Sequence, residues 1–222
     1  GLVLDSYILY IVITTVFLVV IGLSINDFKK IINSIVFFTL AVLVVNGQDF
    51  VLNNVLSPKQ KQRVETLINP SSDPLGSGWN ITQSKIAIGS GGFFGKGFLR
   101  GTQTGLNFVP IQSTDFIFSV IGEEFGYLGA MIFVILYLIF LYRILILSEY
   151  QKDKFARVFG YSTFSIFLFH FTVNVSMTLG LFPVIGIPLS FISYGGSSLL
   201  SFSLLLFIFL KLDSVKPSIL AR

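Results

Sequence analysis

Five apolar stretches, each about 20 residues long, constrain this chain more than any other feature of its sequence. They cover approximately residues 7–23, 31–50, 116–142, 158–179 and 189–212. A helix needs about 20 predominantly apolar residues to cross the hydrocarbon core of a bilayer. The expected fold is therefore an all-α polytopic membrane protein with five transmembrane helices.

The composition agrees with a bilayer as the solvent. Hydrophobic residues make up 53% of the chain and charged residues 12%, whereas soluble domains are about 25% charged. The net charge is +4, and most basic residues lie in short segments between the apolar stretches. This distribution is typical of membrane topology signals, so no nucleic-acid partner is expected. The chain has no cysteine and one histidine, which excludes disulfides and a histidine-rich metal site. The start at Gly1 lacks a charged leader, so we expect no signal peptide and a longer parent protein.

The basic residues also predict the orientation. They lie in three groups: after the first stretch, between the third and the fourth, and at the end of the chain. If the five spans alternate in direction, all three groups lie on the same side of the membrane. The positive-inside rule identifies that side as cytoplasmic. These residues are Lys29, Lys30, Arg143, Lys152, Lys154, Arg157, Lys211, Lys216 and Arg222. We therefore expect a single membrane domain, residues 1–222, with a cytoplasmic C-terminus and a long extracytoplasmic loop, residues 51–114, whose length is typical of functional loops.

The long loop has internal order. Residues 59–68 show helical spacing, and residues 69–78 are rich in Pro, Ser, Asp and Gly, which is typical of turns. Residues 79–88 are expected to form an amphipathic helix or a half-membrane segment. The glycine-rich run at residues 89–101 has the spacing of neither a P-loop nor a dinucleotide fingerprint, so no nucleotide is expected.

Two interpretations of the glycine-rich run remain open. Its backbone either approaches a ligand or a lipid headgroup closely, or forms a plain flexible turn. Lys85, Lys96 and Arg100 lie in or near the run and favour an anionic, phosphate-bearing partner for the first interpretation.

Three carboxylates stand at or inside the third apolar stretch. Asp115 lies at its outer mouth, where spacing alone favours a helix N-cap over a general base. Glu123 and Glu124 lie about two turns further in, where an acidic side chain is costly and suggests a polar, cavity-facing role. The alternative is an interfacial position, at the depth of the lipid headgroups, with no functional role.

Polar residues also interrupt the last two stretches. His170 and Asn174 are four residues apart on one helical face, which favours interhelical hydrogen bonds over a proton relay. Residues 186–198 combine Pro, paired Gly and four Ser within an apolar context. Such a segment predicts irregular backbone beside a cavity, or close packing between helices.

Three motifs in the chain resemble a known family. PVIGIPLSFISYGGSS at residues 183–198, STDFIFSVIGEEFG at residues 113–126 and the loop sequence at residues 69–110 are similar to the shape, elongation, division and sporulation family. The loop and the STDFIF segment resemble the RodA members more than the FtsW members. The similarity covers only the C-terminal part of the family's chain. Relatives often have Glu and His where this chain has Ile111 and Ser113.

The resemblance implies a peptidoglycan glycosyltransferase of the bacterial inner membrane that polymerises lipid II for cell elongation and rod shape. Asp115 matches the family's catalytic aspartate, and this match outweighs the preference for a helix cap. The resemblance also implies a divalent cation, Mg or Mn, at Asp115 and a class B penicillin-binding protein as partner. Membrane lipids and the nascent glycan strand complete the expected partners.

Two alternatives stay open, namely a lipid II flippase and a non-catalytic scaffold for the transpeptidase. Donor-site residues normally come from the family's N-terminal half, so activity of this chain alone stays an open question. The residues expected to contact substrate are Gln83, Ser84, Lys85, Lys96, Arg100, Glu123, Glu124, Ser193, Tyr194, Gly195 and Gly196.

Overall fold

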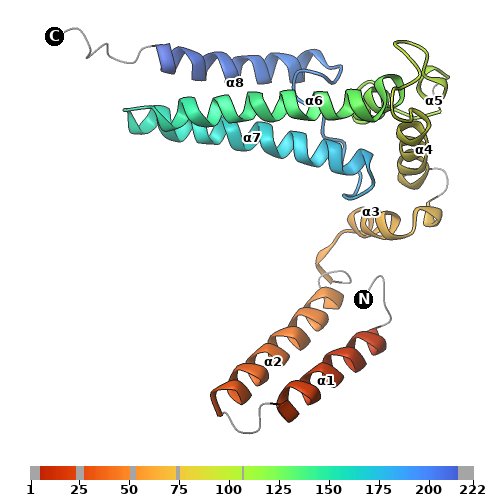
Figure 1. Ribbon diagram of the computed structural model, residues 1–222, viewed down its shortest axis with the longest axis vertical. Helices are drawn as coiled ribbons and strands as arrows, with labels where there is room; N and C mark the ends of the chain where they lie inside the picture. The colour runs from red at the N-terminus through yellow and green to blue at the C-terminus, as the bar shows by residue number, and fades with distance from the viewer. Residues whose placement is uncertain (1–5, 24–27, 51–53, 74–75, 107, 215–222) are drawn as a thin grey trace. The chain divides into compact units, whose positions relative to one another are not determined.

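The computed structural model describes residues 6–23, 28–50, 54–73, 76–106 and 108–214, and every regular element in these ranges is a helix (Figure 1). Their contacts divide the chain into two compact units, residues 1–72 and 73–222. The expectation of a single membrane domain stays a prediction. The helices are α1 (Ser6–Leu23), α2 (Phe28–Phe50), α3 (Pro58–Ile68), η2 (Pro70–Ser72), α4 (Ser77–Ser90), α5 (Thr102–Gly105), α6 (Ile117–Glu149), α7 (Lys154–Thr178) and α8 (Gly196–Ser214).

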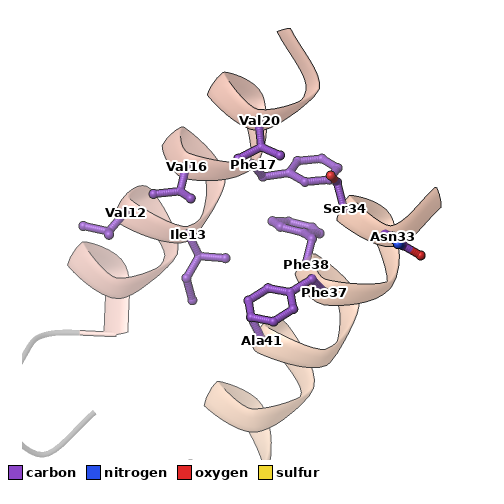
Figure 2. A pocket seen from close by; sticks show the side chains of 10 residues that line it. All are labelled: Val12, Ile13, Val16, Phe17, Val20, Asn33, Ser34, Phe37, Phe38 and Ala41. Atoms are coloured by element: carbon purple, nitrogen blue, oxygen red, sulfur yellow. The ribbon is translucent and has the colours of Figure 1, made fainter. Parts of the chain in front are cut away.

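In the first unit, α1 and α2 pack against each other as a helical hairpin. The rings of Phe17 and Phe38 stack with their centroids 4.2 Å apart, and the Tyr10 hydroxyl donates to Asn46 Oδ1 at 3.0 Å. An apolar groove of about 400 Å³ lies between the two helices. Figure 2 shows Phe37 and Val16 among the residues that line it.

Helix α3 confirms the helix expected at residues 59–68. Ser57 and Gln60 form a capping box, in which the Ser57 hydroxyl accepts from the Gln60 N–H and the Gln60 side chain accepts from the Ser57 N–H. Pro58 stands in the first turn, where its missing N–H has no helical partner to lose. The helix therefore begins at Pro58, one residue before its expected start.

The second unit contains α4 to α8 (Figure 1). Helix α7 packs against both α6 and α8. Their shared core is aromatic. The rings of Tyr137 and Phe171 stack at 4.4 Å, and Phe167 and Phe209 are fully buried. Helix α4 packs against α6 and α7, and α5 packs against α4 and α6, so the part of the loop that precedes α6 is fastened to the helical core.

Within the described residues, α6, α7 and α8 are long and apolar enough to cross a membrane. They match the third, fourth and fifth expected spans. The first two expected spans are also helical, as α1 and α2, but the apolar part of α2 is shorter, Ile32–Gly47. Membrane crossing by these two helices stays a prediction.

The fifth span differs from its expected start. It was expected from Leu189, but α8 begins at Gly196 and the residues before it are irregular. Gly186 has φ +75° and Phe191 has φ +67°, and Pro188 has no N–H to donate. These residues confirm the predicted irregular backbone for residues 186–195, whereas residues 196–198 already belong to α8.

Candidate active site

Asp115 lies in a tight turn that directly precedes α6. The N–H groups of Thr114 and Asp115 both donate to the carbonyl oxygen of Ile111 at 3.2 Å. Ile111 has φ +56°, which is unusual for a β-branched residue. The N-cap position of α6 is Phe116, and no side chain caps the helix there. The interpretation of Asp115 as the N-cap is therefore wrong, and its carboxylate is not occupied by helix N–H groups.

The irregular segment before α8 holds this turn in place. The Tyr194 N–H donates to the carbonyl oxygen of Ser113 at 2.8 Å, and the Ser193 hydroxyl donates to that of Thr114 at 2.5 Å. The Ser193 hydroxyl also accepts from the Leu189 N–H at 2.8 Å. Ser193 and Tyr194, which the sequence assigned to the site, are thus brought to the turn that carries Asp115.

Helix α7 supplies two further hydrogen bonds to the same region. The Asn174 amide donates to the carbonyl oxygens of Asp115 and Ile187, at 2.9 and 2.8 Å. His170 Nδ1 lies 3.1 Å from the carbonyl oxygen of Pro188. These contacts confirm a hydrogen-bonding role for His170 and Asn174, but the acceptors lie in the segments before α6 and α8, not in the helices expected from the sequence.

The carboxylate of Asp115 is half-buried beside Gly186. A Cβ atom at Gly186 would stand 3.3 Å from Asp115 Oδ2, so the absent side chain leaves room for the carboxylate. Burial raises the pKa of the Asp115 carboxyl above its ordinary value of 3.8, while a hydrogen bond from the Thr114 side chain acts in the opposite direction. A carboxylate whose pKa lies above its ordinary value is a stronger base.

A second structural feature lies just inside α6. The helix is interrupted at Gly126, whose φ of +68° and ψ of −166° are not helical. Such a break leaves carbonyl groups before it and N–H groups after it without helical partners. The glycine-rich run supplies these partners through its own backbone. The bonds run from the N–H groups of Lys96, Gly97, Tyr127 and Leu128 to the carbonyl oxygens of Glu123 (3.0 Å), Glu124 (2.9 Å), Gly92 (2.9 Å) and Phe93 (3.1 Å).

Only glycine fits where the run meets the break. A Cβ atom at Gly95 would lie 2.2 Å from the carbonyl oxygen of Glu124, and one at Gly126 would lie 2.3 Å from the Gly95 nitrogen. The sequence offered either a close approach to a ligand or a flexible turn for this run. The structure shows a close approach, but the surface approached is the backbone of α6.

Glu123 fastens the loop from its other side. Its carboxylate is fully buried and accepts from Lys96 Nζ at 2.6 Å. The N–H groups of Thr102, Gln103 and Thr104 donate to it at 2.8, 2.9 and 2.8 Å, and the Thr104 hydroxyl donates at 2.8 Å. A buried charge requires this degree of pairing. A direct contact between this carboxylate and substrate would need these bonds to open.

Lys96 is committed to the same cluster. Besides Glu123, its ammonium donates to the hydroxyls of Ser90 and Thr102 at 2.7 and 2.6 Å, which uses all three of its protons. Arg100 is exposed. Lys85 is also exposed, and its side chain lies beside Gly180 at the end of α7. Lys85 and Arg100 are therefore the more accessible of the three predicted basic residues.

The remaining predicted residues are distributed over α4, α6 and α8. Ser84 is fully buried and its hydroxyl donates to the carbonyl oxygen of Thr178 at 2.8 Å, so it joins α4 to α7. Gln83 and Glu124 are 8% and 7% exposed. Gly195 and Gly196 lie at the start of α8. Substrate contact by these residues stays a prediction.

A divalent cation was expected at Asp115. The described residues contain no group of three or more His, Cys, Asp or Glu side chains that could enclose a metal ion. Mg²⁺ is often held by one or two carboxylates together with substrate phosphates. A half-buried carboxylate without an ion pair among the described residues fits this shared mode of binding and does not fit an all-protein cage.

Sequence reasoning missed two contributions to the site. The backbone N–H groups of residues 102–104 donate to the Glu123 carboxylate, and the side chains of these residues do not predict this role. Gly186 makes room for the Asp115 carboxylate, whereas the sequence showed only a glycine before a proline. Asn174 was identified as a hydrogen-bonding residue, but its partner could not be named without the fold.

Comparison with known proteins gives consistent relatives. The profile of the cell cycle protein family of FtsW, RodA and SpoVE matches residues 4–217. The peptidoglycan glycosyltransferase RodA of Treponema pallidum is 50% identical over 145 residues, which are 65% of this chain and 34% of that protein. The peptidoglycan glycosyltransferase MrdB of Escherichia coli is 48% identical over 141 residues, 64% of this chain and 38% of that protein. A probable peptidoglycan glycosyltransferase FtsW of Trichlorobacter lovleyi is 42% identical over 146 residues, 66% of this chain and 38% of that protein.

The fold is also similar to a solved structure. A chain from work on the structural coordination of polymerization and crosslinking by a peptidoglycan synthase complex aligns with a TM-score of 0.61 and 26% identity. The alignment covers 94% of this chain and 62% of that chain. This chain therefore spans only part of its relatives, and about a third of the length of the curated RodA protein that it matches.

Proposed function

Because this chain belongs to the family of cell cycle proteins that includes FtsW, RodA and SpoVE, we propose that the full-length protein containing it is a peptidoglycan glycosyltransferase with Asp115 as its catalytic base. The observation that carries this proposal is the placement of Asp115. Its carboxylate is half-buried and unpaired by any basic side chain among the described residues. Three hydrogen bonds from residues of α7 and the segment before α8 hold its turn.

The proposed reaction is an inverting glycosyl transfer on lipid II. Asp115 removes the proton from the 4-hydroxyl of the acceptor's N-acetylglucosamine as that oxygen attacks the anomeric carbon of the donor's N-acetylmuramic acid. The new glycosidic bond forms as the bond to the pyrophosphate breaks, and undecaprenyl pyrophosphate leaves with the electron pair. The pKa of Asp115, raised by burial, makes its carboxylate a better base for this proton.

The leaving group carries negative charge that needs compensation. Lys85 and Arg100 are exposed basic residues suited to this role, whereas Lys96 is held by Glu123. A divalent cation shared between Asp115 and the substrate phosphates would add further charge neutralisation. We assign Glu123 to the support of the loop that carries Arg100.

We further propose a role in cell elongation, with a class B penicillin-binding protein as partner. The RodA and MrdB relatives are 50% and 48% identical, compared with 42% for the FtsW relative. The solved relative comes from a complex that coordinates polymerization and crosslinking. In the proposed topology the chain lies in the bacterial inner membrane, with residues 51–114 outside and the C-terminus in the cytoplasm, following the positive-inside rule.

The test uses the full-length protein purified with its transpeptidase partner. Incubation with lipid II is expected to give a ladder of glycan strands on a gel, and Asp115→Asn is expected to give none. Asp73→Asn serves as a matched control, since this loop carboxylate instead accepts from the Ser77 N–H at 2.9 Å and should leave polymerisation intact.

Three outcomes would overturn the proposal. Glycan synthesis by Asp115→Asn would remove Asp115 from the chemistry. Movement of lipid II across vesicle membranes without any glycan product, unaffected by Asp115→Asn, would instead establish a flippase. Binding of the transpeptidase with neither lipid movement nor product would indicate a scaffold.

A further inference from the structure

We propose that Asn174 is a positioning residue for Asp115, because its buried amide ties the main chain of Asp115 to the irregular segment that faces the Asp115 carboxylate. The inference deepens the proposed function and rests on it, since Asp115 is the base in that proposal. It assigns to α7 a direct part in the geometry of the site.

The Asn174 side chain is fully buried. Its Nδ2 atom donates one proton to the carbonyl oxygen of Asp115 at 2.9 Å and the other to that of Ile187 at 2.8 Å. Both acceptors are carbonyl oxygens, which cannot donate, so the nitrogen of the amide must face them. One side chain on α7 therefore joins two segments that are far apart in the sequence.

Neither segment is held in this way by regular structure. Asp115 precedes the first residue of α6, and Ile187 lies between Gly186, at φ +75°, and Pro188, which has no N–H. A buried carbonyl group outside a helix or sheet needs a partner from elsewhere in the fold. Asn174 provides it for both.

Asn174 completes a series of three ties. The carbonyl oxygens of residues 113, 114 and 115 accept in turn from the Tyr194 N–H, the Ser193 hydroxyl and the Asn174 amide. The last of these is the tie to Asp115 itself. Since Ile187 is the neighbour of Gly186, the same amide fixes both sides of the close contact between the Asp115 carboxylate and Gly186.

The geometry also indicates which part of Asn174 matters. Its Oδ1 atom is buried and has no hydrogen-bond partner among the described residues. The amino group therefore makes both ties. Aspartate has the same shape without these two donors, and leucine has a similar volume without any polar atom, so the two substitutions remove the ties in different ways.

The experiment compares Asn174→Asp and Asn174→Leu with wild type in the full-length protein and its partner, using lipid II as substrate. Thr163→Val is the control, because Thr163 is also fully buried on α7 but its hydroxyl donates to Phe159 of its own helix at 2.9 Å. A misplaced reacting group costs about a hundredfold in rate when displaced by about 1 Å. We expect kcat to fall by about tenfold to a hundredfold in both Asn174 variants, with KM within about twofold of wild type.

Hydrogen exchange separates positioning from general destabilisation. In both Asn174 variants the amides of residues 113–116 and 187–194 are expected to exchange faster, while those in the middle of α6 and α7 exchange as in wild type. A kcat equal to that of Thr163→Val, or faster exchange along the whole of α7, would overturn the inference.

Failure of the proposed function would look different. If wild type makes no glycan, or if Asp115→Asn polymerises lipid II as wild type does, the catalytic assignment itself fails, and with it the role of Asn174 in catalysis. If wild type is active and Asp115→Asn is not, but the Asn174 variants keep full kcat, only the present inference is wrong.

Discussion

The half-buried position of the Asp115 carboxyl suits the proposed role of a base, and the same burial destabilises its charged form. Burial raises the pKa of its carboxyl above 3.8, so the native state binds this proton more tightly than the unfolded chain. Between 3.8 and the raised value, the free energy of unfolding therefore falls as the pH rises. At neutral pH the charged carboxylate destabilises the fold, and we expect Asp115→Asn to raise the melting temperature while abolishing polymerisation.

The measurement is thermal unfolding of the full-length protein in detergent at pH 7, with EDTA present to remove any bound cation. Asp73→Asn provides the comparison, because the Asp73 carboxylate accepts from the Ser77 N–H and hydroxyl at the start of α4. Its charge favours that helix terminus, so the same substitution should not raise the melting temperature. A lower melting temperature for Asp115→Asn would contradict the argument. In wild type, polymerisation should also decline as the pH is lowered through the raised pKa, since the base must be charged.

The adjacent residues Glu123 and Glu124 should respond differently to the same substitution. Glu123→Gln removes a buried charge that Lys96 and the backbone of residues 102–104 require, which should cost roughly 3 kcal/mol. Glu124 has no side-chain hydrogen bond or ion pair among the described contacts, so Glu124→Gln should cost much less. Limited trypsin digestion after Lys96 and Arg100 reports on the loop. Equal digestion of the two variants would show that Glu123 does not fasten it.

The residues of the site were predictable to different degrees. Asp115 was found because its motif resembles that of a known family. His170 and Asn174 were found because their spacing places them on one helical face. The role of Glu123 could not be predicted, since its partners are backbone N–H groups that any sequence would carry and that only the fold brings to it.

Among the elements, the interrupted helix α6 makes the sharpest prediction. Gly126 and Gly92 both have positive φ, +68° and +60°. A Cβ atom at Gly126 would clash with the Gly95 nitrogen at 2.3 Å, whereas one at Gly92 would meet nothing within 4 Å. Gly92→Ala should therefore cost about 1–2 kcal/mol for its backbone conformation alone. Gly126→Ala should cost about 1–3 kcal/mol more, because the neighbouring loop must move.

Chemical or thermal unfolding of both variants in detergent measures this difference, and Gly89→Ala is the control without positive φ or a close neighbour. Equal losses for Gly92→Ala and Gly126→Ala would mean that the loop does not pack against the break as described. The comparison thus separates the strain of one residue from the contact between two elements.

Elements were predicted best where local signals decide. The helix at residues 59–68 was predicted from its helical spacing, and residues 79–88 were expected to form an amphipathic helix or a half-membrane segment. Both segments are helical, as α3 and α4. The break in α6 was missed because Gly126 lies inside the third expected span, residues 116–142, where a single glycine does not by itself indicate the end of a helix. The late start of α8 reflects the hydrogen bonds that residues 187–194 make to α7 and to the turn before α6, which replace those of a helix.

At the scale of the whole molecule, orientation is the testable feature. We expect Gln62, on α3, to face outward and Lys152, between α6 and α7, to face the cytoplasm; both are exposed. The chain has no cysteine, so single cysteines at these positions give no background from the chain itself. A membrane-impermeant maleimide should label Gln62→Cys in spheroplasts and Lys152→Cys only after lysis.

The reverse pattern would invert the topology and place Asp115 in the cytoplasm. Labelling of both positions in intact spheroplasts would mean that residues 62 and 152 lie on the same side of the membrane. That result would contradict the single crossing proposed between them. Thr114, next to Asp115 in the turn, is too enclosed for this purpose, which is why the reporters lie on exposed segments away from the site.

The backbone hydrogen bonds between the glycine-rich run and the break in α6 have a consequence for protein engineering. Each segment supplies the backbone partners that the other lacks, so neither can be replaced without the other. In chimeras with a relative, residues 89–101 and residues 122–128 form one unit of exchange. Grafting either segment alone should give an unstable protein, and grafting both should restore stability, although the two segments are separate in the sequence.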